Sequence, residues 1–264
     1  MKRYGLIGFP LKNNFSVNYF TEKFKQLNLK DYSYENFSLE NIEDLIPLIE
    51  VNPDLLGLNI TIPHKISIIK YLDELDESAQ NTDAVNCVKI LRSEQFSVHS
   101  SQFNKGYKLI GFNTDAYGFE KSLSTFLSDG KKIDAALILG TGGAAKAVAY
   151  VLQNMKIDFS FVTRNIKHQT SNTKQFSYEM LDEKILAEHP LIINCTPVGM
   201  FPNLNEVHPI PYQFITPQHL AFDLIYHPSE TLFLNHFREL GAKTKNGLEM
   251  LHLQADKAWE IFRI

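Results

Sequence analysis

Three polar side chains with distinct chemistry follow one apolar segment of the chain. Asn59, Thr61 and Lys65 lie at or just beyond the end of residues 55–61, an apolar run that predicts a strand. A lysine can donate a proton and can stabilise negative charge that develops on a carbonyl oxygen. The amide and the hydroxyl can orient a small polar molecule through hydrogen bonds. The combination indicates proton transfer at an oxygen atom, although a single lysine is more often a solvated surface charge.

A second group of polar residues stands at two other predicted turns. Asn86 ends the short segment Asp83-Ala-Val-Asn86, and Asp115 ends Asn113-Thr114-Asp115 at the exit of another apolar run. Taken singly, each of these residues is explained by a turn, and Thr114 or Asp115 can cap the helix predicted after it. Ligands of open α/β sheets bind beyond the carboxyl ends of the strands. The joint placement of these residues therefore indicates a site.

Residues 135–155 have the order strand, glycine-rich turn, helix. The apolar run Ala135–Leu139 predicts a buried strand, Gly140-Thr141-Gly142-Gly143-Ala144 follows it, and small and apolar residues continue as a helix. Gly140 permits a tight turn, and Gly142 lets the backbone approach a pyrophosphate whose charge the helix N-terminus stabilises. The segment indicates a dinucleotide site, although glycine turns also open helices that bind nothing.

The end of the next predicted strand indicates which dinucleotide is bound. Residues 159–163 lead into Thr163-Arg164-Asn165, and no carboxylate stands there to bind a ribose 2′-hydroxyl. The guanidinium of Arg164 can pair with a 2′-phosphate. This favours NADP, with an exposed loop arginine as the alternative.

Strand and helix patterns alternate along the rest of the chain, which predicts an α/β fold with mostly parallel sheets covered by helices. In the first half we expect a hairpin between the halves over residues 93–108, together with strands at 4–7, 32–39 and 55–61 and helices at 20–27, 41–51 and 66–72. In the second half we expect strands at 135–139, 159–163, 191–195 and 220–225 and helices at 144–155, 229–240 and 248–262.

Composition excludes several classes of protein. The chain has 264 residues, 44% of them hydrophobic, and a formal net charge of −4 without a basic block, so nucleic acid is a poor partner. The apolar runs are too short to cross a bilayer, and the N-terminus lacks a signal peptide, so we expect a cytoplasmic protein. Cys87 and Cys195 have no metal-site spacing and read as buried thiols. We expect no metal.

Nine short motifs, in the same order along essentially the whole chain, resemble those of the shikimate dehydrogenase family. They are Gly8-Phe-Pro10 with Ser16, Asn59-Ile-Thr61-Ile-Pro63-His64-Lys65, Ala84-Val85-Asn86, Gly111–Gly118, Gly140–Ala144, Thr163–Asn165, Asn194–Met200, Asp223–Pro228 and Gly247–Ala255.

The resemblance implies a reversible NADPH-dependent reduction of 3-dehydroshikimate to shikimate. It implies that Lys65 is the general acid or base at the C3 oxygen, and that Asp115 orients the substrate hydroxyl and holds Lys65. The substrate-binding residues that it implies are Asn14, Ser16, Asn59, Thr61, Asn86, Tyr226 and Gln254. The cofactor-binding residues are Gly140, Thr141, Gly142, Gly143, Ala144, Thr163, Arg164, Asn165, Thr196, Gly247 and Met250.

The resemblance also implies the domain organisation. We expect an N-terminal three-layer α/β substrate domain over residues 1–114 and a Rossmann-like NADP-binding domain over residues 115–240. The C-terminal segment, residues 241–264, is expected to return to the first domain, with the site in the cleft between the two domains. The protein is expected to be a monomer or a homodimer.

The chain departs from the family pattern at six positions. Thr163 and Asn165 exchange the residues that flank the arginine in that pattern. Asn14 stands where the family has a serine, Val17 replaces a proline, His64 replaces a phenylalanine and Cys87 replaces a threonine. His64 is then either a hydrogen-bonded neighbour or a local charge. These departures leave open a quinate/shikimate dehydrogenase that uses NAD. They also leave open a non-catalytic metabolite binder, although such a protein would have no need of both Lys65 and Asp115.

Overall fold

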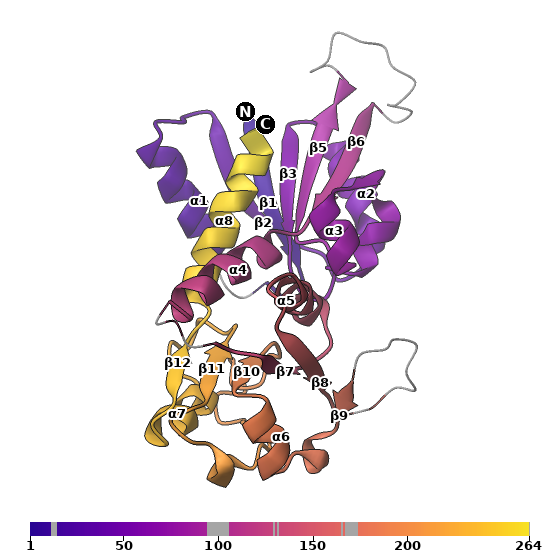
Figure 1. Cartoon of the computed structure of the whole chain (residues 1–264). Coiled ribbons are helices and arrows are strands. Elements are labelled where there is room, and N and C mark those ends of the chain that lie inside the picture. Colours follow the sequence, from indigo (N-terminus) through magenta and orange to yellow (C-terminus); the bar gives the residue numbers. More distant parts are fainter. Residues whose placement is uncertain are drawn as a thin grey trace. The chain divides into compact units, whose positions relative to one another are not determined.

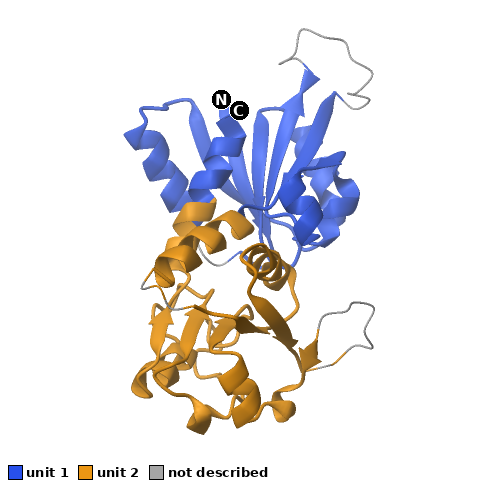
Figure 2. Cartoon of the chain, viewed as in Figure 1, with its two compact units in different colours: residues 1–114, 255–264 blue, residues 115–254 orange. Residues whose placement is uncertain are grey.

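The structure, a computed structural model, describes the chain except residues 12–14, 94–105, 129, 131, 165, 167–173 and 264. The chain divides into two compact units (Figure 2). Unit 1 comprises Met1–Thr114 and Ala255–Ile264, and unit 2 comprises Asp115–Gln254. Residues 241–254 therefore belong to unit 2, and only the last ten or so residues of the chain belong to unit 1.

Unit 1 contains a mixed sheet with the strand order β2-β1-β3-β5-β6-β4 (Figure 1). The strands are β1 (Lys2–Gly8), β2 (Tyr32–Ser38), β3 (Leu55–Ile60), β4 (Glu74–Leu75), β5 (Cys87–Arg92) and β6 (Tyr107–Phe112). Strand β1 is parallel to β2 and β3, and β4 is parallel to β6, but β5 is antiparallel to both of its neighbours.

Five of the six described strands of unit 1 therefore run in one direction and β5 runs against them, so the prediction of a mostly parallel sheet is confirmed, with β5 as the exception. Strands β5 and β6 are consecutive in the chain and adjacent in the sheet, and such a pair closes as an antiparallel hairpin without a crossover helix. A hairpin was expected at residues 93–108, but most of that range lies outside the described residues, and the strands that pair flank it.

Helices cover both faces of this sheet and produce three layers. They are α1 (Phe15–Gln26), α2 (Leu45–Val51), α3 (Glu77–Thr82), the end of α8 (Leu248–Arg263), and the 3₁₀ helices η1 (Ile42–Asp44) and η2 (Ser67–Tyr71). One core packs Leu45, Ile68 and Ala79 against the sheet, and the other packs Phe20 and Trp259 against it.

Two local expectations in unit 1 need correction. The α-helix expected at residues 66–72 is the short 3₁₀ helix η2, because its backbone bonds, such as Ile69 N–H to the Ile66 carbonyl, span three residues. The helix expected to run through Leu27 ends at Gln26, and Leu27 is exposed.

Unit 2 contains a parallel sheet with the strand order β12-β11-β10-β7-β8-β9. The strands are β7 (Ala135–Leu139), β8 (Asp158–Val162), β9 (Gln175–Phe176), β10 (Leu191–Asn194), β11 (Leu220–Asp223) and β12 (Lys243–Lys245). The chain starts in the middle of the sheet, builds one half outward and then the other. This order is that of the Rossmann fold, so the predicted fold class is confirmed.

Helices of unit 2 pack on the two faces of its sheet. They are α4 (Thr114–Phe126), α5 (Gly143–Asn154), α6 (Glu183–Glu188), α7 (Leu232–Glu239), and the 3₁₀ helices η4 (Tyr178–Met180) and η5 (Tyr212–Phe214). Phe119 and Val148 belong to the core on one face, and Leu186 and Phe233 to the core on the other. In the described part of the chain, no helix is long and apolar enough to cross a membrane.

Candidate active site

Polar residues of unit 1 lie together at one edge of its sheet. Asn59, near the end of β3, pairs with Cys87 at the start of β5, and Cys87 pairs with Phe112 at the end of β6. Because β5 is antiparallel to both neighbours, the ends of β3 and β6 lie beside its start. Asn86 and Asn113 are the residues directly before β5 and after β6, so they reach the same edge as Asn59.

Asn86 connects this edge to the start of helix α4. Its backbone carbonyl accepts the N–H of Ile60 at 2.8 Å and the side-chain amide of Asn59 at 3.4 Å. Its side-chain oxygen accepts the N–H of Thr114 at 2.6 Å, and its Nδ2 donates to the Thr114 hydroxyl at 3.0 Å. Asn86 therefore caps α4, and Asp115 follows Thr114 directly in the chain with only 6% of its surface exposed.

Asn113 is a turn residue, which agrees with the simpler explanation of its motif. Its N–H donates to Ser78 Oγ at 2.8 Å, and its Nδ2 donates to Thr82 Oγ1 and to the Ala84 carbonyl, both at 2.9 Å. These bonds hold the segment 84–86 against α3, so that Asn113 supports the neighbours of the site.

The segment that carries Lys65 is tied to the same edge by its backbone. The Lys65 carbonyl accepts the N–H of Val85 at 2.8 Å, and the side chain is partly buried. His64 is 3% exposed and is hydrogen-bonded to the neighbouring segment, because its Nε2 lies 2.7 Å from the Leu39 carbonyl. Thr61 donates its N–H to the Ile7 carbonyl at 2.8 Å, which places it beside the end of β1.

Tyr34 is a residue of this group that sequence reasoning did not single out. It lies on β2, is buried, and its hydroxyl bonds to the side chains of both Asn59 and Ser16. The alternation of residues along β2 could have placed Tyr34 inward, but only the tertiary structure shows which residues its hydroxyl reaches. Asn14 lies outside the described residues.

In unit 2, the glycine turn lies where the strand order of the sheet reverses. Gly140 follows β7 with a φ of +100°, and a Cβ there would lie 2.8 Å from Cγ2 of Thr196, which follows β10. Strands β7 and β10 are neighbours, and the chain leaves them in opposite directions across the sheet. Ligands of open α/β sheets bind at such a point.

The residues after Gly140 leave room for a bound phosphate. Gly142 precedes α5 as its N-cap, and a Cβ built on it would meet no other atom within 4 Å. Thr141 is exposed, and Gly143 and Ala144 form the first turn of α5 with partial exposure. The free N–H groups at this helix start can hold a pyrophosphate, so the residues fit a dinucleotide.

The end of β8 carries the arginine expected to recognise a 2′-phosphate. Arg164 is exposed, and Thr163, just before it, donates its N–H to the Phe176 carbonyl at 3.0 Å. Arg164 is also close enough to lower the pKa of His208 through its charge. Asn165 lies outside the described residues.

A buried polar network that sequence reasoning missed supports the loop containing Thr196. Asn194 Oδ1 accepts the N–H of Thr196 at 2.9 Å and its hydroxyl at 2.8 Å. Asn194 Nδ2 donates to Asp223 at 3.0 Å, and the Thr231 hydroxyl donates to the same carboxyl at 2.6 Å. Burial raises the pKa of Asp223 to about 7, although these hydrogen bonds oppose the shift.

His208 and Tyr178 extend this network towards β9. His208 Nε2 lies 3.0 Å from Asn194 Oδ1, and its Nδ1 lies 2.9 Å from the Tyr178 hydroxyl. Burial, followed by the charge of Arg164, lowers the pKa of His208 to about 4. The neutral ring therefore donates from Nε2 and accepts the tyrosine hydrogen at Nδ1. No local pattern around these residues indicated this connection.

The remaining predicted residues lie near or on α8. Gly247 has no space for a side chain, since a Cβ would lie 2.1 Å from the Leu224 carbonyl oxygen. Met250 is 7% exposed and packs in the core of unit 2. Gln254 donates to the Leu251 carbonyl at 3.0 Å, and Tyr226 is partly exposed.

Gln254 lies close to the first turns of α4. A Cβ at Gly118 would lie 3.1 Å from Cβ of Gln254, so helices α4 and α8 approach closely at this glycine. Asp115 precedes Gly118 by three residues and lies on the same side of α4. Unit 2 thus brings Gln254 near the turn that carries Asp115.

Neither cysteine belongs to these groups as a reactive thiol. Cys87 and Cys195 are free, and burial raises the pKa of both thiols. Within the described ranges, no three His, Cys, Asp or Glu residues are grouped so that they could hold a metal ion.

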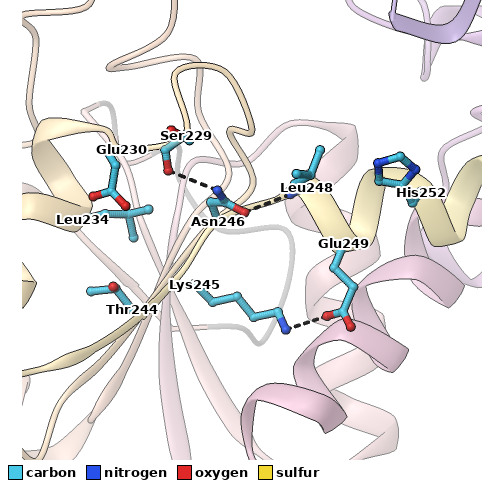
Figure 3. A pocket seen from close by; sticks show the side chains of 9 residues that line it. All are labelled: Ser229, Glu230, Leu234, Thr244, Lys245, Asn246, Leu248, Glu249 and His252. Carbon is cyan, nitrogen blue, oxygen red and sulfur yellow. Dashed lines mark hydrogen bonds and ion pairs between the residues drawn. The ribbon is translucent and has the colours of Figure 1, made fainter. Parts of the chain in front are cut away.

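A pocket of unit 2 lies beside β12 and the start of α8, and its lining residues flank Gly247 and Met250 in the chain (Figure 3). It is lined by Ser229, Glu230, Leu234, Thr244, Lys245, Asn246, Leu248, Glu249 and His252. Lys245 and Glu249 form an ion pair of 2.5 Å in it, and Asn246 Nδ2 donates to the Ser229 carbonyl at 3.0 Å. Glu230 pairs with Arg238, and Glu249 also accepts from the Ser122 hydroxyl, so several polar groups of the lining already have partners and we assign no ligand to the pocket.

Comparisons with known proteins agree with this arrangement. The family model "Shikimate dehydrogenase substrate binding domain" matches residues 6–88. A shikimate dehydrogenase (NADP(+)) of Methanococcus maripaludis is 37% identical over 275 residues, covering 99% of this chain and 91% of the relative.

Solved structures are similar over the whole chain. That of shikimate dehydrogenase from Aquifex aeolicus has a TM-score of 0.82 and 30% identity, and the match covers 99% of this chain and 92% of that one. The structure of the Thermus thermophilus enzyme in complex with NADP(H) and shikimate has a TM-score of 0.79 and 27% identity. The match covers 99% of this chain and 93% of that one. The chain therefore belongs to the shikimate dehydrogenase family.

Proposed function

We propose that the protein is an NADP-dependent shikimate dehydrogenase, which reversibly reduces 3-dehydroshikimate to shikimate. The observation that carries this proposal is the polar edge of the sheet in unit 1. There the segments that bear Lys65, Asn86 and Thr114 are joined by hydrogen bonds, and Asp115 follows Thr114. A second support is the glycine turn before α5, which fits a dinucleotide phosphate.

Lys65 and Asp115 carry the proton-transfer chemistry in this proposal. NADPH, when bound, supplies a hydride to the C3 carbonyl carbon of 3-dehydroshikimate. The Lys65 ammonium donates a proton to the C3 oxygen, and in the reverse direction the neutral amine takes it back. The carboxylate of Asp115 orients the substrate hydroxyl and holds the Lys65 side chain in position.

Substrate recognition is assigned to hydroxyl and amide groups, which suit a small polyhydroxylated acid. Ser16 and Asn14 bind the carboxylate in this proposal, with Tyr226 near it. Ring hydroxyls are bound by four residues, which are Asn59, Thr61, Asn86 and Gln254. A site of this kind discriminates against a substrate that lacks one of these hydroxyls by about 10⁴-fold.

The proposed cofactor is NADP. The N-terminus of α5 binds the pyrophosphate, with Gly140, Thr141, Gly142, Gly143 and Ala144 forming the turn. Arg164, with Thr163 and Asn165, recognises the 2′-phosphate, while Thr196, Gly247 and Met250 lie along the remainder of the cofactor. An NAD-dependent quinate/shikimate dehydrogenase is not favoured, because the Methanococcus relative is named for NADP(+) and Arg164 stands where an NAD site needs a carboxylate.

Steady-state kinetics test this proposal. Shikimate and quinate are each offered with NADP and with NAD, and we expect the highest kcat/KM with shikimate and NADP. Faster turnover of quinate with NAD would contradict the proposed substrate and cofactor, and no turnover of either acid would contradict the reaction. We expect the enzyme to act in the cytoplasm as a monomer or a homodimer, which sedimentation analysis can distinguish.

A further inference from the structure

Tyr34 lies between two residues that the proposed function assigns to the substrate. Its hydroxyl is 2.8 Å from Oδ1 of Asn59 on β3, and it is also hydrogen-bonded to the side chain of Ser16 on α1. The ring is 4% exposed and stacks on Phe20 with a centroid distance of 4.3 Å and an interplanar angle of 10°. The phenol group therefore has a defined position and two polar neighbours.

The number of available hydrogens determines the direction of both bonds. A phenol has one hydrogen, and an amide oxygen only accepts, so Tyr34 must donate to Oδ1 of Asn59. The remaining bond then requires the Ser16 hydroxyl to donate to the tyrosine oxygen. The direction of each bond is thereby set by Tyr34.

The bond to Tyr34 determines the orientation of the Asn59 side-chain amide, that is, the positions of its Oδ1 and its Nδ2. Oδ1 is held towards Tyr34, and Nδ2 lies on the opposite branch, 3.4 Å from the Asn86 carbonyl. That distance leaves a weak bond, so Nδ2 is the group of Asn59 able to donate to a substrate hydroxyl. A flipped amide would present an acceptor there instead.

The bond to Ser16 has a different consequence. In the bond between them, the Ser16 hydrogen points to Tyr34. A carboxylate accepts hydrogen bonds only, so Ser16 must turn its hydrogen away from Tyr34 to bind one. Tyr34 thus holds that hydrogen until a carboxylate takes it.

We propose that Tyr34 is a positioning residue for the substrate, which sets the hydrogen-bond directions of Ser16 and Asn59. It acts through these two side chains and does not itself contact substrate. The proposal rests on the proposed function, because Ser16 and Asn59 are assigned there to the carboxylate and a ring hydroxyl.

The variant Tyr34→Phe tests this proposal with little disturbance of packing. It removes the hydroxyl, leaves the stacked ring, and deprives the buried Asn59 oxygen of its donor. We expect KM for shikimate to rise about tenfold, because a buried polar group left without a partner loses most of its orientation. KM for NADP should stay within about twofold, since that ligand is assigned to other residues.

Tyr32→Phe is the matched control. Tyr32 lies two residues away on the same strand and packs against Tyr4 and Trp259, but its hydroxyl bonds to the exposed Lys2. Its loss should leave both KM values unchanged. An unchanged KM for shikimate in Tyr34→Phe, with only a lower melting temperature, would overturn the proposal and leave Tyr34 a core residue.

A spectroscopic measurement separates this proposal from the proposed function. The side-chain amide resonances of Asn59, assigned with the variant Asn59→Asp, should shift in Tyr34→Phe and not in Tyr32→Phe. Absence of the shift would overturn the proposal whatever the substrate is. A clear shift in Tyr34→Phe, combined with a wild-type protein that fails to oxidise shikimate, would instead overturn the proposed function alone.

Discussion

The side-chain oxygen of Asn86 accepts a hydrogen bond from the backbone N–H of Thr114 at 2.6 Å. This bond caps helix α4 and joins the segment before β5 to the residue before Asp115. Asn86 is also assigned to a substrate hydroxyl in the proposed function. It therefore has two roles that different substitutions can separate.

Asn86→Ala should lose both roles, while Asn86→Asp should lose only the second. An aspartate keeps an oxygen for the Thr114 N–H but cannot donate to a substrate hydroxyl. We expect Asn86→Ala to lower the unfolding free energy by about 1–2 kcal/mol, the usual cost of losing a cap. Denaturant unfolding and KM for shikimate measure the two effects. Equal stability of the wild type and Asn86→Ala would show that the cap is unimportant.

Lys65→Ala should lower kcat by several orders of magnitude while the protein still binds shikimate. Removing a general acid costs about 10²–10⁴-fold in kcat, because the proton must then come from solvent. The matched control is Lys70→Ala, since Lys70 lies on the adjacent η2, is exposed and forms an ion pair with Glu43 at 3.4 Å. Turnover near the wild-type rate in Lys65→Ala, measured as NADPH formation with saturating shikimate, would end the catalytic assignment of this lysine.

The two glycines of the turn before α5 should respond differently to alanine. Gly140→Ala should destabilise unit 2, because φ is +100° and the new Cβ would lie 2.8 Å from Thr196. Gly142→Ala should leave the melting temperature nearly unchanged, because its φ is −78° and the space around it is open. It should nevertheless raise KM for NADP, since the Cβ occupies the approach to the pyrophosphate. Unimpaired NADP binding in Gly142→Ala would show that the pyrophosphate does not bind at this turn.

Arg164→Ala should change the preference between cofactors. Loss of a charge-assisted bond to a 2′-phosphate should lower kcat/KM with NADP by about 10- to 100-fold and leave the value with NAD nearly unchanged. Arg238→Ala is the control, because Arg238 forms an ion pair with Glu230 on the surface of unit 2. An equal loss with both cofactors in Arg164→Ala would argue against recognition of the 2′-phosphate.

Asp223 should make stability depend on pH. Burial raises its pKa from the ordinary value of 3.8 to about 7, so the folded protein binds this proton more tightly than the unfolded chain does. The contribution of Asp223 to the free energy of unfolding is therefore fully present below pH 3.8, the pKa in the unfolded chain. It is lost as the pH rises through about 7, the pKa in the folded protein. The amide in Asp223→Asn can keep bonds to Thr231 and Asn194 and does not titrate.

The comparison of Asp223→Asn with the wild type isolates this contribution. Between about pH 5 and about pH 8, the wild type should lose stability relative to the variant in urea unfolding. A stability difference that stays constant over this range would show that Asp223 titrates near its ordinary value.

Strands with contiguous apolar residues were predictable from sequence. The runs that form β7, β10 and β11 are buried at nearly every position. A strand that is buried on both faces appears in the sequence as a continuous run of apolar residues. The short strands β9 and β12 were missed because two or three residues are too few to show a period. The antiparallel direction of β5 was missed as well. The residues of a strand do not indicate whether the strand beside it runs parallel or antiparallel to it.

The sequence by itself determined the fold class, the family and the residues at which chemistry is expected, because motifs are patterns of nearby residues. Their roles as site residues stay predictions. Only the tertiary structure decided what surrounds them, including the bonds of Tyr34 to Ser16 and Asn59 and of His208 to Asn194. Such bonds join residues on different strands and helices. Their formation depends on sheet register and on the burial of each side chain, which arise only when the whole chain packs.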